Sequence, residues 1–482
     1  MIKFTELTDL IHSNHDQIVK SVQDCIRIKS VSEDKQGTVA ALNFFLNLGQ
    51  KMGFRSKNVD NLGGIIEFGD GEKTIGIIVH LDTVPEGTGW QFPPFEGQIK
   101  DGKIYGRGAM DDKGPAVAAL YALKTLKDLG VKPKQKVQMI IGIDEETVWD
   151  STLKFLTKIK EPDFSFVPDS KFPIVIAEKG LLWLELTKEL QSQNKTAQWN
   201  KQNIIIKQMS SGGESINIVP DYCEATLMVS EDGVQHIEQI EQKLKKFLQE
   251  NESYKIELVH NKTEPDNGRR ESEVKLLSYG KSAHAFVCNE GQNAISQLML
   301  FLNDLDLLPE QKAFVQTYVT KLGMEHYGES LGIQMEDELT GKLTLNPGYI
   351  FLDEKQAILK VDLRFPASQQ LKAVKAQVES AFKVFEGDIK FIDSLESLNF
   401  PEDDPHIQKL LKVYRAYTGD QEAKPLGMGG TTYSKAFKNA VAFGPTFPGM
   451  AKVEHQPDEY IEIDHLIKCT EIYALAIHEL LK

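Results

Sequence analysis

Histidine and carboxylate side chains follow a short apolar segment near residue 80. The run TIGIIVH at 74–80 has the composition of a buried strand and leads directly into His80-Leu81-Asp82. Residues two apart on an extended backbone share a face, so His80 and Asp82 are expected to point the same way. That arrangement suits a histidine metal ligand whose ring is oriented by a neighbouring carboxylate. A strand-end pair that makes only local hydrogen bonds would also fit these two residues.

A second cluster lies in the glycine-rich loop GRGAMDDKGP at 106–115, which leads into a segment of helical periodicity. Glycines let the backbone bend sharply and approach a site closely. Asp111 and Asp112 make this a poor phosphate-binding loop, because they place negative charge where the anion would sit. The carboxylates instead suit a cation. A capped helix start would explain one aspartate but not the whole loop.

Three more clusters contain acidic residues or histidine. They are Asp144-Glu145-Glu146 after the apolar run KVQMIIGI, Asp169 in VPDS, and His455 in VEHQPDE. Adjacent residues on an extended backbone face opposite ways, so Glu145 and Glu146 can serve different partners. One could bind a metal while the other acts as a general base. Each cluster alone also fits a solvated loop, a turn or a surface histidine.

Read together, the clusters predict one site in an α/β fold. Helical and apolar strand-like segments alternate from about residue 40 to 180, which indicates a mostly parallel sheet covered by helices. Ligands bind such sheets at the carboxyl ends of the strands, where these side chains occur. Two imidazoles and three carboxylates would suit two divalent cations about 3.5–4 Å apart. No thiolate is involved, so zinc, manganese and cobalt are all chemically suitable.

The middle of the chain has a different pattern. Strand-like segments, several with period-two alternation, are separated there by helical stretches, and the α/β pattern returns near residue 395. We therefore expect a discontinuous metal-binding catalytic domain of residues 1–183 and 395–482. An α+β domain of residues 184–394 would be inserted into it.

Composition argues against several kinds of partner. The chain has 55 Lys and Arg against 70 Asp and Glu, a formal net charge of −15, which disfavours nucleic acids and anionic membrane surfaces. No apolar run approaches the ~18 residues of a membrane helix, and acids and histidines interrupt the N-terminal segment where a signal peptide would be apolar. The four cysteines are far apart and lack CxxC spacing, as is typical of reduced thiols. These features predict a cytoplasmic protein.

Nine motifs give the chain a specific resemblance over about residues 25 to 465. In chain order they are HLDTVP, GRGAMDDKGP, DEET, PDSKFP with EKG, ESINIVPD, GKSAHA, DLRFP, GMGGTTYSKAF and HQPDEYI. The chain resembles the metallopeptidase superfamily of aminoacylases, carboxypeptidases and dipeptidases, and within it the dipeptidase V branch. The resemblance implies a di-zinc exopeptidase-like catalytic domain with an inserted lid domain that closes over the substrate.

The resemblance also implies a set of metal ligands. Two divalent ions, zinc in the first place and manganese or cobalt as alternatives, would be held by His80, Asp111, Glu146, Asp169 and His455. Asp111 would bridge the two ions, and the peptide bond between Asp111 and Asp112 would be cis.

Three residues would carry catalytic roles on the same resemblance. Asp82 would orient His80, Glu145 would activate water as the general base, and His284 of the lid would stabilise the oxyanion. From the residues alone, His284 is equally an ordinary loop residue.

The resemblance places the substrate contacts in both domains. Asn217 and Arg364 would come from the lid, with Arg364 clamping the terminal carboxylate through its planar guanidinium. The loop at 427–432, just before a helix, would offer backbone N–H groups from Gly429, Gly430 and Thr431. The structural alternatives are a turn for Asn217 and a strand-end ion pair for Arg364.

The sequence thus predicts a metal-dependent dipeptidase acting on unblocked dipeptides. Asp144 offers a carboxylate that could help to accept the free ammonium group of such a substrate. One alternative is a deacylase or desuccinylase of N-acyl amino acids that uses the same site. The other is a non-catalytic metal-dependent binding protein, which is disfavoured because such a protein does not need Glu145. The inserted domain is about twice the length of a single small domain, so we expect a monomer, with a dimer as the alternative.

Overall fold

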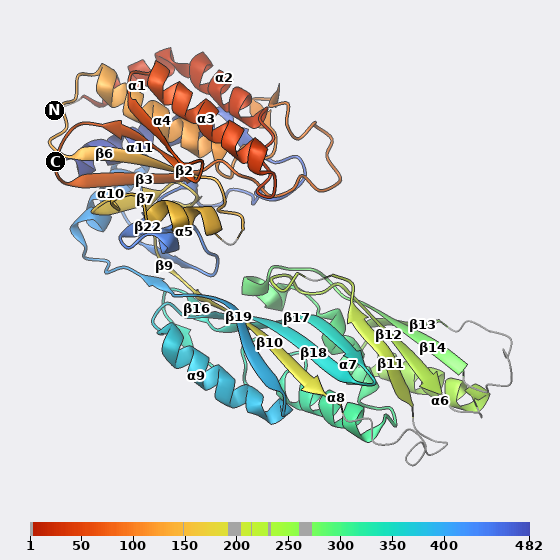
Figure 1. Ribbon diagram of the computed structural model, residues 1–482. Coiled ribbons are helices and arrows are strands. Elements are labelled where there is room, and N and C mark those ends of the chain that lie inside the picture. The colour runs from red at the N-terminus through yellow and green to blue at the C-terminus, as the bar shows by residue number, and fades with distance from the viewer. Residues whose placement is uncertain (1–2, 148, 191–203, 214, 230–232, 260–271) are drawn as a thin grey trace. The chain divides into compact units, whose positions relative to one another are not determined.

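The computed structural model describes residues 3–147, 149–190, 204–213, 215–229, 233–259 and 272–482 (Figure 1). The chain divides into two compact units. The first unit is Met1–Ala177 with Leu398–Lys482, and the second unit is Glu178–Ser397. These boundaries lie a few residues from those expected after residues 183 and 394.

The first unit is built on a nine-stranded mixed sheet in the order β1-β2-β6-β3-β7-β22-β9-β20, with β21 beside β9. Pairing is parallel among β6, β3, β7 and β22 in the centre, and antiparallel in β1-β2-β6 and β22-β9. The strands are β1 Arg55–Val59, β2 Gly63–Phe68, β3 Thr74–His80, β6 Lys136–Gly142, β7 Phe164–Val167, β9 Val175–Glu178, β20 Leu398–Asn399, β21 Leu426–Met428 and β22 Ala440–Ala442. β3 is buried at every position, as expected of a central strand covered on both faces.

Helices cover this sheet, and most of them share one apolar core with it (Figure 1). They are α1 Phe4–Ser13, α2 His15–Ile26, α3 Lys35–Lys51, α4 Lys113–Asp128, α5 Asp150–Leu156, α10 Pro405–Thr418 and α11 Ile463–Leu480. α3 begins after Asp34, whose side chain accepts the N–H groups of Gln36 and Gly37. Short elements complete the unit: β4 Gln98–Lys100, β5 Lys103–Tyr105 and β24 Tyr460–Glu462 in one small sheet, β8 Ser170–Lys171 with β23 Pro445–Thr446, and the 3₁₀ helix η3 Tyr433–Ala436.

The second unit is an eight-stranded sheet in the order β13-β14-β12-β11-β17-β18-β10-β19. Its pairings are antiparallel. The strands are β10 Gly180–Glu189, β11 Ile205–Ser211, β12 Tyr222–Val229, β13 Lys255–Val259, β14 Ser272–Tyr279, β17 Thr344–Asp353, β18 Gln356–Phe365 and β19 Asp388–Leu395. Burial alternates strictly along β12, so one face of the sheet carries the core.

Four helices pack on that core: α6 Gly233–Glu250, α7 Ala294–Leu302, α8 Pro309–Lys321 and α9 Leu371–Phe382 (Figure 1). The unit also contains two 3₁₀ helices, η1 Ala285–Glu290 and η2 Lys383–Phe385, and the short pair β15 Glu336–Asp337 and β16 Gly341–Lys342. Among the described residues of the chain, no helix is both long and apolar enough to cross a bilayer.

The central parallel strands of the first unit lead to the residues singled out in the sequence. β3 ends at His80, β6 ends two residues before Asp144, and β7 ends two residues before Asp169. Parallel strands point their carboxyl ends to the same edge of a sheet. The acidic and histidine clusters that follow these strands therefore lie at the same edge of the sheet.

Candidate metal centre

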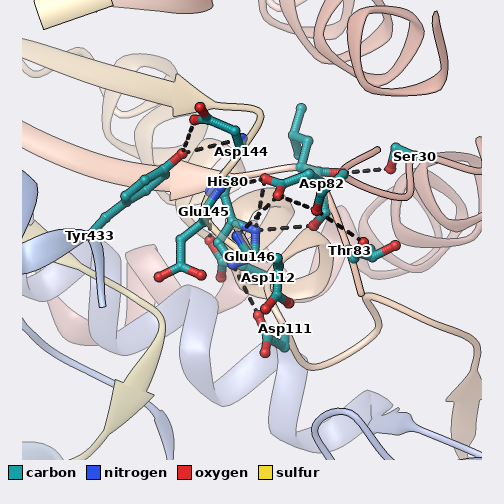
Figure 2. A network of polar contacts seen from close by, with 12 residues as sticks. Ser30, His80, Asp82, Thr83, Asp111, Asp112, Asp144, Glu145, Glu146 and Tyr433 are labelled. Carbon is teal, nitrogen blue, oxygen red and sulfur yellow. Dashed lines mark hydrogen bonds and ion pairs between the residues drawn. The ribbon is translucent and has the colours of Figure 1, made fainter. Parts of the chain in front are cut away.

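Two histidines approach the two oxygens of one aspartate. His80 Nε2 lies 3.0 Å from Asp111 Oδ1, and His455 Nε2 lies 3.0 Å from Asp111 Oδ2. His80 and Asp111 are seen together in Figure 2. The carboxylate and the two imidazoles thus bring oxygen and nitrogen atoms together in an arrangement that could hold a metal ion.

The remaining expected ligands lie beside these two imidazoles. Asp169 Oδ2 is 3.5 Å from His80 Nε2, and Glu146 Oε1 is 3.0 Å from His455 Nε2. Potential ligand atoms lie within 4.8 Å of one another in the group His80, Asp111 and Glu146, and in the group His80, Glu145 and Asp169. The structure thus brings together the five side chains expected as ligands.

Asp82 ties the first histidine to the loop after β6. Its carboxylate lies 3.4 Å from His80 Nδ1 and accepts the N–H groups of Glu145 (3.1 Å) and Glu146 (3.2 Å). The Ser32 hydroxyl donates to the same carboxylate (2.7 Å), and Asp82 is fully buried. One aspartate therefore fixes both a ligand ring and the backbone that carries the next two acids.

The expected cis peptide bond between Asp111 and Asp112 is present. Asp112 is buried, and its Oδ2 accepts the backbone N–H of His80 (3.1 Å). The two neighbouring aspartates therefore serve different partners: Asp111 lies between the histidines, and Asp112 holds the end of β3.

Burial and crowding of like charges shape the electrostatics of the cluster. Burial, followed by the charge of Asp111, raises the pKa of Asp169 to about 7 and raises the pKa of Glu146 as well. Burial lowers the pKa of His455, but hydrogen bonds to Asp111 and Glu146 outweigh it and raise that pKa to about 11. The cluster therefore concentrates more negative charge than its imidazoles balance.

The donor set fits divalent cations. It offers imidazole nitrogen and carboxylate oxygen and no thiolate, which suits zinc, manganese or cobalt. A bound cation would supply the positive charge that the crowded carboxylates need.

Glu145 lies within the cluster but differs from the ligands in its contacts. Its backbone is held by Asp82 and by Trp149, whose Nε1 donates to the Glu145 carbonyl (2.8 Å). Figure 2 shows its side chain extending away from Asp82. Burial, together with nearby carboxylates such as Asp169, raises its pKa well above the usual range. A proton acceptor is thus placed next to the candidate ion site.

Asp144 has a structural role in place of the substrate contact considered from the sequence. Its carboxylate accepts the N–H groups of Ser151 and Thr152 at the start of α5, and also the hydroxyl groups of Thr152 and Tyr433. The contact with Tyr433 is visible in Figure 2. Asp144 therefore caps a helix and anchors Tyr433 beneath the cluster.

In the second unit, Asn217 and His284 come from two segments that lie side by side. The Asn217 carbonyl accepts the N–H of Ala285 (2.9 Å), and an isolated antiparallel bridge joins Ile218 and His284. His284 Nδ1 accepts the N–H of Phe286 (3.3 Å), so the neutral ring carries its proton on Nε2. That tautomer makes Nε2 a hydrogen-bond donor.

Arg364 forms the strand-end ion pair that its position in β18 allowed. Its Nε and Nη2 lie 2.8 and 3.0 Å from the two carboxylate oxygens of Asp362, which also accepts from Trp183 Nε1 (2.8 Å). The guanidinium plane is therefore fixed by Asp362. A substrate carboxylate would have to bind through its other edge, at Nη1.

The expected carboxylate-binding loop at 427–432 is in the first unit, with Gly429, Gly430 and Thr431 partly exposed. The helix expected after it is the four-residue turn η3. Any anion bound there would depend on individual N–H groups, because so short a turn has little helix dipole.

Sequence reasoning missed two buried charged residues, Arg107 and Glu459. They form an ion pair (2.7 Å) although 352 positions separate them. Burial, then the charge of Asp111, raises the pKa of Glu459 to about 7, while Arg107 acts in the opposite direction. Their membership of the motifs GRGAMDDKGP and HQPDEYI was the available signal.

Sequence comparison classifies the chain. Residues 76–479 match peptidase family M20/M25/M40. The chain belongs to this family. A Bacillus subtilis (strain 168) relative named "Putative dipeptidase YtjP" is 36% identical over 477 residues, covering 97% of this chain and 98% of that protein. A Staphylococcus haemolyticus relative of the same description is 31% identical over 477 residues, covering 96% and 97%.

Solved structures of M20 peptidases and dipeptidases share the fold. Human carnosine dipeptidase 1 aligns with a TM-score of 0.55 at 15% identity and covers 99% of this chain and 100% of that one. The dipeptidase Dug1p of Saccharomyces cerevisiae aligns with a TM-score of 0.57 at 14% identity, covering 99% and 98%. This peptidase of the M20 family therefore has the architecture of a catalytic domain with an inserted domain.

Proposed function

We propose that this protein is a dipeptidase that hydrolyses the peptide bond of unblocked dipeptides with the help of two divalent metal ions, zinc in the first place. The observation that carries the proposal is the placement of His80 and His455 on opposite oxygens of Asp111, with Glu145 alongside. The names of the sequence relatives support the substrate class.

The ions would be held by the five converging side chains, His80, Asp111, Glu146, Asp169 and His455. When bound, two such ions polarise a carbonyl oxygen and lower the pKa of water. Side chains of the protein would transfer the protons and hold the ligands in place. Glu145 accepts a proton from the attacking water and returns it to the leaving amine. Asp82 keeps the His80 ring in place through Nδ1.

We further propose that the second unit is a lid that binds the substrate. His284 Nε2–H would donate to the oxyanion of the tetrahedral intermediate. Asn217 and the open edge of Arg364 would contact the substrate, and Arg364 would bind its terminal carboxylate. The N–H groups of Gly429, Gly430 and Thr431, from the first unit, would bind the same carboxylate. The protein would act as a monomer that supplies all of these groups from one chain.

A competition assay tests the substrate class. Protein stripped of metal and reloaded with zinc or manganese would be given an equimolar mixture of dipeptides, β-alanyl dipeptides, tripeptides and N-acyl amino acids, read by mass spectrometry. The proposal predicts that unblocked dipeptides disappear first. Loss of N-acyl amino acids with dipeptides untouched would replace the proposed substrate with that of a deacylase, and no loss of any compound would contradict catalysis.

A further inference from the structure

A buried ion pair that the proposed mechanism does not use joins the two motifs that carry Asp111 and His455. Arg107 and Glu459 lie 2.7 Å apart, from Nη1 to Oε2, and are 2% and 0% exposed. Neither residue belongs to the ligand set, yet each is four positions from a ligand. Arg107 precedes Asp111 and Glu459 follows His455 at that distance.

Glu459 holds the segment that ends in Asp111. Its Oε1 accepts the N–H groups of Met110 (2.9 Å) and Asp111 (3.2 Å), and its backbone carbonyl accepts the N–H of Gly106 (2.8 Å). Both ends of the segment 106–111 are therefore bound to one glutamate. Any shift of the Glu459 carboxylate would be passed to the backbone of Asp111.

Arg107 holds two other segments that carry residues of the site. Nη1 also donates to the carbonyl of Gln456 (3.3 Å), directly after His455. Nη2 donates to the carbonyls of Pro85 (3.4 Å) and Glu86 (3.2 Å), in the loop that follows Asp82. One guanidinium thus connects three loops: the loop after β3, the loop before β24 and the loop that contains Arg107. Arginine suits this role because its planar guanidinium donates several hydrogen bonds in fixed directions, which the lysine ammonium does not.

The segment that carries His455 needs such support. His455 and Asp458 have φ values of 64° and 56°, in the left-handed region that residues other than glycine seldom adopt. Such conformations persist where surrounding contacts hold them. The Asp458 side chain supplies one contact by accepting the N–H groups of Gln91 and Phe92. The bond from Arg107 to Gln456 supplies another, next to the ligand itself.

We propose that Arg107 and Glu459 are a pair of positioning residues that set the placement of Asp111 and His455 for metal binding. This inference rests on the proposed metal site. The contacts of the pair run to the backbone of the ligand-bearing loops, so the pair acts through the ligands rather than on the ions. The competing explanation is that the ion pair only stabilises the fold. In that case a variant would have a lower unfolding temperature but unchanged metal affinity. If the pair positions the ligands, the variant would lose metal affinity as well.

Metal affinity measured without substrate separates these explanations. Zinc ions, and manganese ions in a second series, would be titrated into the stripped full-length protein in competition with a chelating dye. We expect Glu459→Gln, which keeps the volume but loses the charge, to bind 10- to 100-fold more weakly than wild type, the usual loss when a supporting residue of a metal site is changed. Arg107→Met should lose as much, and Arg107→Lys, which keeps the charge but not the fork, should lose less.

Two further variants sharpen the test. The double variant Arg107→Met/Glu459→Gln should bind metal no more weakly than the worse single variant, because the two residues act as one unit. Tyr121→Phe is the matched control, since it removes a buried hydrogen bond to Ser21 and a partly buried one to the Gln17 carbonyl in the same unit. It should lower the unfolding temperature and leave metal affinity within about twofold of wild type.

These measurements distinguish a failure of this inference from a failure of the proposed function. If the folded variants bind metal within twofold of wild type, the pair only stabilises the fold and the inference is wrong. If Arg107→Met does not fold, the metal affinities of Arg107→Lys and Glu459→Gln decide between the two explanations. If the wild-type protein binds metal tightly and the variants bind it more weakly, the inference is supported even if no dipeptide is cleaved. Absence of metal binding by the wild-type protein overturns both.

Discussion

Individual side chains in the cluster have sharply different partners although they are neighbours in the chain. Among the acids after β6, Asp144 caps α5, Glu145 faces the cluster and Glu146 lies against His455. The same division occurs at Asp111 and Asp112. Charge alone therefore does not decide the role of a residue here; its position relative to a strand end does.

Replacing Glu145 with glutamine tests the general base. The amide cannot accept a proton from water, so kcat should fall by about 10²–10⁴-fold, the usual contribution of such a group. Metal content, measured by elemental analysis, should be unchanged. Asp150→Asn, a nearby exposed charge at the start of α5, is the control and should retain activity. Full activity of Glu145→Gln would remove it from this role.

Metal binding should release protons in neutral solution. The pKa of Asp169 is raised to about 7 and that of His455 to about 11, so metal-free protein carries protons on these groups near pH 7. Because ligands bind metal in their deprotonated form, apparent affinity should rise with pH from about 6 to 9. Calorimetry of zinc binding in buffers of different ionisation enthalpy measures the protons released. A pH-independent affinity with no proton release would contradict this picture.

Much of the candidate site could be predicted at the residue scale, since acidic residues at strand ends and in glycine-rich loops leave a local signal. Asp82 and Glu145 each follow an apolar strand, and Asp111 lies in a glycine-rich loop. The motifs that contain Arg107 and Glu459 could not show that the two residues pair, because they meet only when distant loops fold together. The capping role of Asp144 was equally hidden, since its partners lie in the next helix.

Elements place these side chains by a few buried polar contacts as well as by packing. In the second unit, the Asn346 side chain of β17 is almost fully buried. Its Nδ2 donates to the carbonyls of Ile216 and Ile218, both at 3.0 Å. These carbonyls flank Asn217, whose own carbonyl is bonded next to His284. β17 therefore fixes the segment that brings these two residues together.

Replacing Asn346 with alanine should lower kcat/KM about 10-fold or more in protein that remains folded, because displacement of positioned groups is costly. Gln311→Ala is the matched control: this buried amide donates to the carbonyls of Ile206 and Asp353, away from the 216–218 segment. It should lower the unfolding temperature without that kinetic loss. Equal kinetic losses in the two variants would show that Asn346 acts only through stability.

The elements themselves were predicted unevenly from sequence. Continuous apolar runs identified β3 and β6. β1, with the sequence RSKNV, has no apolar alternation, so its antiparallel place at the sheet edge was not visible. The N-terminal segment forms two helices, because the backbone leaves the helical conformation at Asn14 (φ −95°, ψ 4°), between α1 and α2.

At the scale of the molecule, one chain supplies two units, one with the candidate metal site and the other with Asn217, His284 and Arg364. The second unit already contains an eight-stranded sheet. The period-two patterning of the middle segment allowed this division to be expected, although the boundary residues were not. A single chain with both sets of groups is consistent with the proposed monomer.

Mixing two inactive variants tests whether each chain uses its own His284. His284→Ala should lose about 10²–10³-fold in kcat, as expected for an oxyanion donor. A mixture of His284→Ala and Glu145→Gln should be no more active than its components. Restored activity would mean that one chain completes the site of another and would contradict the proposed monomer. Light scattering gives the independent check against the chain mass of 54.2 kDa.

A single titration that records bound metal and dipeptide hydrolysis together tests whether two ions are needed for dipeptidase activity. Stripped protein would receive zinc or manganese in sub-stoichiometric steps, with free and bound metal and the initial rate measured at each step. Two ions should be bound per chain in the wild type, with full activity only when both are present, and His455→Ala should lose one ion. A protein that binds one ion or none at full activity, or binds two and cleaves no dipeptide, would contradict it.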